Sequence, residues 1–209
     1  MNKQKVIVYV DGFNFYYGLK GDPKWKRYYW LDIVKFFEKF MKPDQELIKV
    51  KYFSARPDNQ EKNARQYAFF QANMENSRFQ LILGKYLKKK ITCFNCGNII
   101  NTYEEKESDV RIATQIVSDS YEKNCDIAIV VSADSDMIPS VELAKQAGQK
   151  VFIYFPPNHY SSNLAAANGH PIQLSKYESR FRQSLLPDVV HLKEKNYDLS
   201  IPEKWKKLR

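Results

Sequence analysis

Short apolar runs rich in β-branched residues recur along the chain. Each run is too short for a typical helix, and its composition predicts a strand buried on both faces of a sheet. The predicted strands are 5–10, 47–53, 79–83, 126–132 and 150–155. The pattern is clearest in 126–132 (DIAIVVS), where four apolar residues in a row follow Asp126–Ile127.

Segments with apolar residues at helical spacing separate these runs. The predicted helices are 13–19, 32–40, 59–75, 107–122 and 136–147. On 59–75 we expect the buried stripe to include Ala64, Tyr67, Ala68 and Met74. On 107–122 we expect it to include Val110, Ala113, Thr114, Val117 and Tyr121. Strands alternating with helices imply right-handed βαβ crossovers, so we predict a single three-layer α/β domain with a central, mainly parallel sheet.

Two segments depart from this alternation. The segment at about 85–104 (KYLKKKITCFNCGNIINTYE) is interpreted as a basic β-hairpin insertion that contains cysteines. From 176 to 209 the periodicity weakens and basic residues are scattered, which predicts a peripheral helix or arm. We therefore expect one domain over 1–175, including the insertion, and a basic C-terminal extension over 176–209.

The formal net charge of the 209-residue chain is +9. A positive balance favours contact with a polyanion such as nucleic acid, although many basic proteins bind none. The apolar run before Asp11 is too short for a signal peptide, and no stretch of about 18 apolar residues follows. We therefore expect a cytoplasmic protein without a membrane partner. A homodimer is an open alternative to a monomer.

Acidic side chains follow the predicted strands at one edge of the sheet. Asp11 comes directly after 5–10, and Asp134 and Asp136 come just after 126–132. Asp109 lies near the start of a crossover helix, which begins at the same edge because it runs antiparallel to the strands. Converging carboxylates repel one another unless a cation lies between them. Oxygen ligands select Mg²⁺ or Mn²⁺, which can activate water for phosphodiester hydrolysis.

Helix capping is the simpler alternative for the same residues. Asp11 could cap 13–19 and Asp136 could cap the helix after it, since aspartate accepts the unpaired N–H groups of a first turn. Asp109 could favour a helix start through the helix dipole. Asp134 is harder to explain in this way, because a second carboxylate two residues away adds nothing to a cap.

Three segments resemble the motif blocks of the NYN domain, a branch of the PIN-like nucleases. They are YVDGFNFYYG, EEKESDVRIATQIV and IAIVVSADSDMIPSVELAKQAGQKV, and the resemblance covers roughly residues 5–175. The resemblance implies a PIN-like parallel-sheet domain that cleaves RNA with a divalent metal ion. One departure is Ala133, where family members commonly have the glycine of SGDSD. We expect an adjusted turn there and a retained site.

The resemblance also implies roles for individual residues. Asp11, Asp109, Asp134 and Asp136 would be metal ligands, and Asn14 would orient a metal-bound water or a phosphate. Further contacts to phosphate, or hydrogen bonds behind the ligands, are implied for Ser132, Ser135, Lys106 and Ser162. Ser162 lies in a Ser-Ser-Asn sequence before LAAA, where simple helix capping is an alternative.

Basic and aromatic residues are mixed in 20–30 and 85–90, as they are on surfaces that bind single-stranded nucleic acid. The candidate RNA contacts are Lys24, Lys26, Arg27, Lys88, Lys89 and Lys90. The alternative is a solvated surface above aromatic core residues, with Trp25, Tyr28 and Trp30 in the core.

Cys93 and Cys96 form a C-x-x-C-G sequence that resembles one half of a zinc site. A structural zinc ion needs four ligands, and His159, His170 and His191 lack metal-ligand spacing with the pair. Zinc would therefore have to be shared between two chains; two reduced thiols in a turn are the alternative.

The sequence thus predicts a metal-dependent endoribonuclease. An RNA-binding or protein-interaction module with weak or no turnover is the main alternative. A phosphatase using Asp11 as nucleophile is disfavoured, because Phe13 stands where such enzymes usually have a second aspartate.

Overall fold

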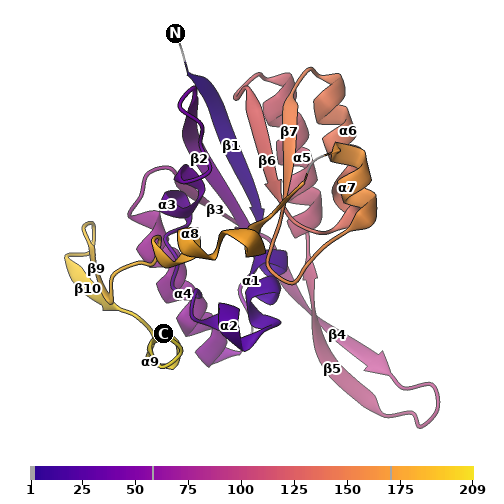
Figure 1. The fold of residues 1–209 in the computed structure, drawn as a ribbon. Coiled ribbons are helices and arrows are strands. Elements are labelled where there is room, and N and C mark those ends of the chain that lie inside the picture. The colour runs from indigo at the N-terminus through magenta and orange to yellow at the C-terminus, as the bar shows by residue number, and fades with distance from the viewer. Residues whose placement is uncertain (1–2, 58, 170) are drawn as a thin grey trace.

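The core of the fold is a six-stranded sheet in which every neighbouring pair of strands is parallel. A computed structural model describes residues 3–57, 59–169 and 171–209. The strand order is β3-β2-β1-β6-β7-β8 (Figure 1). The strands are β1 (Gln4–Asp11), β2 (Gln45–Ser54), β3 (Phe79–Leu83), β6 (Ile127–Val131), β7 (Lys150–Phe155) and β8 (Ile172–Gln173). The predicted parallel sheet is confirmed, and β8 is an additional short edge strand.

One face of the sheet carries the larger hydrophobic core. Val6, Val8 and Val10 of β1 point to this face, where Phe36 and Phe69 are also buried. The helices that contribute to this core or extend from it are α1 (Gly12–Lys20), α2 (Pro23–Lys26), α3 (Ile33–Glu38), α4 (Gln60–Met74) and α8 (Glu178–Arg182). The high aromatic content of the chain is used mainly here.

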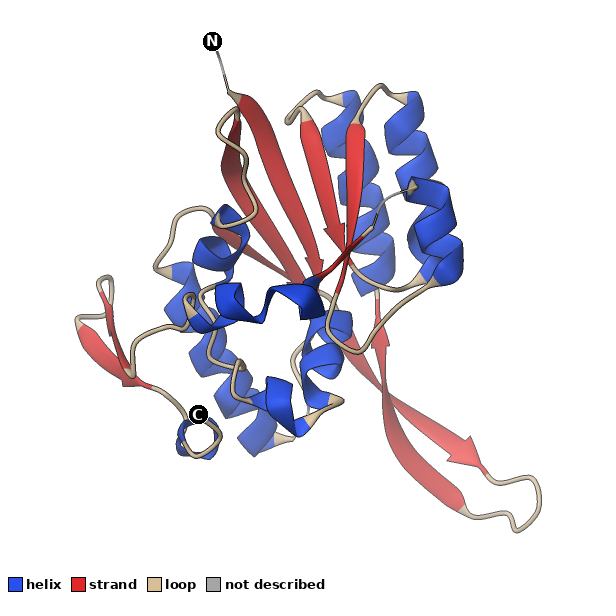
Figure 2. Cartoon of the chain, in the orientation of Figure 1, coloured by secondary structure: helices blue, strands red, loops and turns tan. Residues whose placement is uncertain are grey.

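The other face is covered by a second layer of helices (Figure 2). Ile7 and Tyr9 alternate with the valines of β1 and pack here against Ile112 and Ile116. The elements are α5 (Ser108–Tyr121), the 3₁₀ helix η1 (Ser135–Met137), α6 (Ile138–Gln146) and α7 (Ser162–Asn168). Helices on both faces of the sheet confirm the predicted three-layer architecture.

The buried stripes of two helices differ from those predicted. On α4, Tyr67 and Met74 are exposed, and Phe69, Phe70, Ala72 and Asn73 are buried instead. On α5, Val110 and Tyr121 are exposed, whereas the buried positions are Ser108, Ile112, Ile116, Asp119 and Ser120. Both buried faces include polar side chains that are hydrogen-bonded inside the protein, so apolar periodicity selected the wrong faces.

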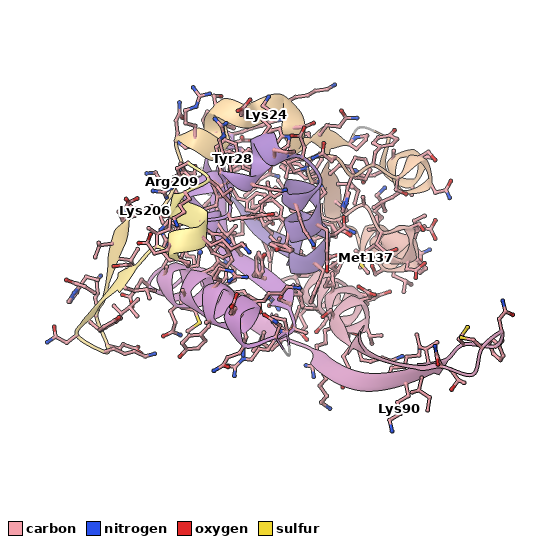
Figure 3. All side chains as sticks on the ribbon, turned by 90° about the horizontal axis from the view of Figure 1, so that it is seen from below. Lys24, Tyr28, Lys90, Met137, Lys206 and Arg209 are labelled. Carbon is pink, nitrogen blue, oxygen red and sulfur yellow. The ribbon has the colours of Figure 1, made fainter. Side chains whose placement is uncertain are left out.

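The predicted hairpin insertion is confirmed. Strands β4 (Lys85–Thr92) and β5 (Ile99–Lys106) pair antiparallel and extend away from the rest of the domain (Figure 1). Lys85 pairs with Lys106 at the base, and Cys93 and Cys96 lie in the turn at the tip. Figure 3 shows Lys90 on this hairpin, far from Met137 near the centre of the domain.

The C-terminal extension is not peripheral, which corrects the sequence-based prediction. Phe181 of α8 is fully buried in the larger core, and Leu186 and Ile201 are buried there as well. Further elements are the 3₁₀ helix η2 (Leu174–Tyr177), the hairpin β9 (Val189–Leu192)–β10 (Tyr197–Ser200) and α9 (Glu203–Lys206). The buried residues of the extension pack against residues that lie far away in the sequence. The apolar periodicity within 176–209 therefore did not indicate that they are buried. Within the described residues, no helix has the length and apolar character needed to cross a bilayer.

Candidate acidic metal site

Asp11 lies where β1 ends and α1 begins. Its carboxylate is 6% exposed and accepts two hydrogen bonds: Oδ1 from the backbone N–H of Asn14 (2.9 Å) and Oδ2 from Oγ of Ser132 (2.9 Å). Gly12 lets α1 start close to β2, because a Cβ there would lie 2.4 Å from the carbonyl oxygen of Phe53. The capping alternative is therefore correct for Asp11, but capping uses only one of its two oxygens.

The loop after β6 is tied to Asp11 and Asn14. Oγ of Ser132 accepts the N–H of Asp134 (3.1 Å), and Oδ1 of Asn14 accepts the N–H of Ala133 (3.2 Å). Oδ1 of Asp134 caps η1 by accepting the N–H of Asp136 (3.0 Å). Ala133 is not among the described residues with positive φ, so the turn accepts alanine without strain, as expected.

The acidic side chains interact through their charges. The pKa of Asp11 is raised to about 6: burial is the main cause and the charges of Asp109 and Asp134 add to it, while the hydrogen bonds from Asn14 and Ser132 oppose the shift. The pKa of Asp109, in the first turn of α5, is raised by partial burial and then by Asp134 and Asp136. The predicted carboxylates thus share one edge of the sheet.

These carboxylates do not form a finished metal cage. Among the described residues, no three aspartate, glutamate, histidine or cysteine side chains are grouped closely enough to hold an ion as they stand. The donor set nevertheless fits a hard divalent cation, because it consists of carboxylate oxygens that already repel one another. Ions of this class also keep several water ligands, so they need few carboxylates.

His159 belongs to this edge and was missed by the sequence analysis. Its Nδ1 lies 2.8 Å from Oδ1 of Asn14, and burial lowers the pKa of the imidazole. The residue follows the end of β7 by four positions, so the strand-end rule that selected Asp11 and Asp134 could have found it. The sequence analysis had considered histidines only as partners of the cysteines.

A family model for the NYN domain matches residues 5–175. The chain belongs to the NYN domain family. The NYN domain is nuclease-like in fold and RNA-related in general.

Two individual proteins show more distant similarity. The 6-hydroxy-3-succinoylpyridine 3-monooxygenase HspA of Pseudomonas putida is 29% identical over 175 residues, covering 66% of this chain. This chain spans about half of that relative, 54% of its length. A crystal structure of a protein of unknown function from Vibrio parahaemolyticus superposes with a TM-score of 0.57 at 21% identity, covering 82% of this chain and 93% of that one. The second similarity concerns the fold alone.

Other predicted site residues of this NYN domain lie around the acidic edge. Ser135 is the first residue of η1 and is half-buried. Ser162 is exposed in the first turn of α7, but the cap is Ser161, whose Oγ accepts the N–H of Leu164 (3.3 Å). Lys106 is exposed at the end of β5, three residues before Asp109. Roles for Ser135, Ser162 and Lys106 in phosphate binding stay predictions.

Three aromatic residues of the segment 20–30 belong to the core and not to a stacking surface. Trp25, Tyr28 and Trp30 are each at most 4% exposed, so the core alternative is correct for them. Lys24 is exposed and pairs with Glu178 across 2.7 Å. The remaining basic candidates here, Lys26 and Arg27, lie at the end of α2 and just after it.

Three of the lysines predicted to contact RNA lie on strand β4 of the hairpin. Lys89 and Lys90 are exposed on β4, whereas the side chain of Lys88 lies outside the described part of the structure. At the tip, backbone N–H groups of Asn95 and Cys96 lower the pKa of the Cys93 thiol. The two cysteines supply half of a zinc site, so sharing between two chains stays a prediction. His170 also lies outside the described residues.

An aromatic cavity of about 170 Å³ adjoins the acidic edge. Gly12 and Phe13, the two residues after Asp11, form part of its wall. Tyr52 also lines it, and the pKa of this phenol is raised by burial and then by the charge of Asp11. The cavity and the acidic site are therefore neighbours that meet where β1 ends and α1 begins.

Proposed function

We propose that this NYN domain is a metal-dependent endoribonuclease that hydrolyses RNA phosphodiester bonds with Mg²⁺ or Mn²⁺. The observation that carries the proposal is the electrostatic convergence of Asp11, Asp109, Asp134 and Asp136 at one edge of the sheet. A carboxylate whose pKa is raised by burial and then by its acidic neighbours destabilises the folded state when it is ionised. It is useful where a cation binds.

The residues of this chain have distinct roles in the proposed reaction. Asp11 would be the most rigidly held ligand of the ion, because Ser132 and the backbone of Asn14 fix the orientation of its carboxylate. Asp109 of α5, Asp134 of the loop after β6 and Asp136 of η1 would complete the ligand set. A bound divalent ion supplies polarisation of the phosphate and an activated water.

Asn14 is the proposed positioning residue for phosphate or water. Its Oδ1 contacts Ala133 N–H and His159 Nδ1, which leaves the Nδ2 amide able to donate to an oxygen of the substrate. Because His159 is buried enough to favour its neutral form, its Nδ1–H can hold the asparagine without adding charge. The net charge of +9 would attract single-stranded RNA to the molecule.

The test is cleavage of single-stranded RNA labelled at either end, and of a circular RNA, in Mg²⁺, Mn²⁺ or EDTA. We expect metal-dependent cleavage of both substrates by the wild type, since an endonuclease needs no free end. Asp109→Asn and Asp134→Asn should each lower the rate by about 100-fold or more. Asp44→Asn is the matched control, because Asp44 precedes β2 and lies at the opposite edge of the sheet.

The outcome also separates the proposal from the binding-module alternative. RNA binding without cleavage under any metal condition would favour a catalytically weak RNA-binding or protein-interaction module on the same fold. Cleavage that survives both aspartate substitutions in folded protein would contradict the assigned site.

A second candidate function is action on a small aromatic heterocycle. The aromatic cavity beside the acidic edge favours it, together with the 29% identity to a protein named as a monooxygenase of a pyridine. Monooxygenation consumes O₂ and a reductant in proportion to substrate. The discriminating measurement is substrate-dependent O₂ uptake with a reduced nicotinamide as electron donor. Uptake by wild type that is absent without the pyridine would favour this candidate over RNA cleavage.

A further inference from the structure

The aromatic cavity is built mainly from two helices that run beside the acidic edge. Helix α1 contributes Tyr16 and Tyr17 directly after the Asp11–Asn14 segment, and helix α4 contributes Gln66 and Phe69 from the opposite wall. Trp205 of α9 closes one side, so the C-terminal extension completes the cavity. Figure 3 views the molecule from below, with Lys206 labelled on α9 and Tyr28 labelled just after α2.

One polar group in the cavity wall is unsatisfied. The Oε1 atom of Gln66 is buried and has no hydrogen-bond partner among the described residues. The amide nitrogen of the same side chain donates to Oγ of Ser54 (3.0 Å), which fixes the amide in place. A buried carbonyl without a donor is costly in a finished core. A ligand that carries an N–H group into the cavity would satisfy this oxygen.

The rest of the wall suits a flat ring attached to an anion. Tyr16 and Tyr29 stack with ring centroids 5.2 Å apart, and Tyr17 is 48% exposed. The side chains of Lys62 and Arg65 line the same cavity from α4. Aromatic faces with cations beside them are the combination that holds bases and phosphates of single-stranded nucleic acid.

We propose that this cavity holds one unstacked base of single-stranded RNA, adjacent to the phosphate bound at the acidic site. The inference rests on the proposed endoribonuclease function, whose substrate it specifies. Every RNA base with a Watson–Crick edge offers at least one N–H donor for Oε1 of Gln66. A volume of about 170 Å³ fits one base, since a cavity of about 150 Å³ in another protein holds a benzene ring.

The experiment measures binding of a fluorescent single-stranded hexanucleotide in EDTA, so that binding is read without cleavage. The comparison is a set of oligonucleotides of the same sequence, each of which lacks the base at one position. We expect Gln66→Leu to weaken binding of intact RNA by about tenfold or more. One abasic position should weaken binding to the wild type the most. The same abasic position should not weaken binding to Gln66→Leu further, because the missing base and the missing amide belong to one contact.

Two further variants keep the test informative. Tyr17→Leu changes an exposed ring of the wall and leaves the core untouched, so it should fold and weaken binding in the same way. Gln71→Leu makes the same chemical change on α4 at a residue that contacts Lys195 and not the cavity, so it should bind as the wild type does.

Each outcome decides the proposal. If Gln66→Leu and Tyr17→Leu bind intact RNA like the wild type, the cavity proposal is overturned even where metal-dependent cleavage persists. If both variants lose binding and no metal supports cleavage, the base pocket stands and the nuclease function fails. A third outcome is that nicotinate quenches the tryptophan fluorescence of the protein without RNA, while no abasic position weakens RNA binding. This result would assign the cavity to a free heterocyclic acid and refute the binding of an RNA base.

Discussion

Asp11→Asn should stabilise the metal-free protein at neutral pH, although it removes a charge from the proposed active site. The Asp11 carboxylate is 6% exposed and has two hydrogen-bond donors, too few to replace its hydration. Burial is the main cause of its raised pKa, about 6 against an ordinary value of 3.8. Asparagine keeps the shape without carrying the charge: its Oδ1 can accept the N–H of Asn14, and its Nδ2 can donate to Oγ of Ser132.

The magnitude follows from linkage. A difference of about 2 pKa units corresponds to a cost of about 3 kcal/mol for the ionised carboxylate in the folded state. Because the folded protein binds this proton more tightly than the unfolded chain, stability falls as pH rises from about 4 to about 6. About 2 kcal/mol of the loss should occur between pH 4.5 and 7.5.

The assay is urea unfolding of wild type and Asp11→Asn in EDTA at pH 4.5, 6.0 and 7.5. All other titrating groups are common to both proteins, so the difference between their unfolding free energies isolates Asp11. We expect this difference to grow in favour of the variant by about 2 kcal/mol across the range. A difference that stays constant with pH would refute the reasoning. Added Mn²⁺ at pH 7.5 should stabilise the wild type and leave the variant nearly unchanged.

The remaining predictions concern the groups that support the site and the core. Ser132→Ala should raise the pKa of Asp11 further, measured by NMR titration, and cost about 1–3 kcal/mol in urea unfolding, because one of two donors is lost. Lys51→Met should cost about 3–5 kcal/mol by the same assay, since buried Asp119 loses its ion-pair partner at 2.6 Å. Phe181→Ala should cost about 3–5 kcal/mol, because its ring is fully buried; a loss under about 1 kcal/mol would contradict the role of the extension in the core.

The order of apolar runs along the chain is enough to predict the parallel sheet and to place Asp11 and Asp134 at one of its edges. Buried strands appear as continuous apolar runs, because both faces of a parallel sheet are covered. Because helices connect parallel strands, the carboxyl ends of the strands all lie at one edge of the sheet. This topology predicts that Asp11 and Asp134 lie at the same edge, and the prediction requires no information on side-chain contacts. The match to the NYN family covers residues 5–175, which include these strand ends.

Which polar side chains are buried with a partner depends on contacts between segments far apart in the sequence. The buried face of α5 includes Asp119, which is stable there because Lys51 and Tyr9 reach it from the sheet. His159 reaches Asn14 across 145 positions of sequence, and Phe181 reaches the core from an extension without clear periodicity. The apolar periodicity of a segment indicates only which face of its own helix or strand is apolar. Pairing across the fold depends on distances between segments, and those are fixed only when the whole chain packs.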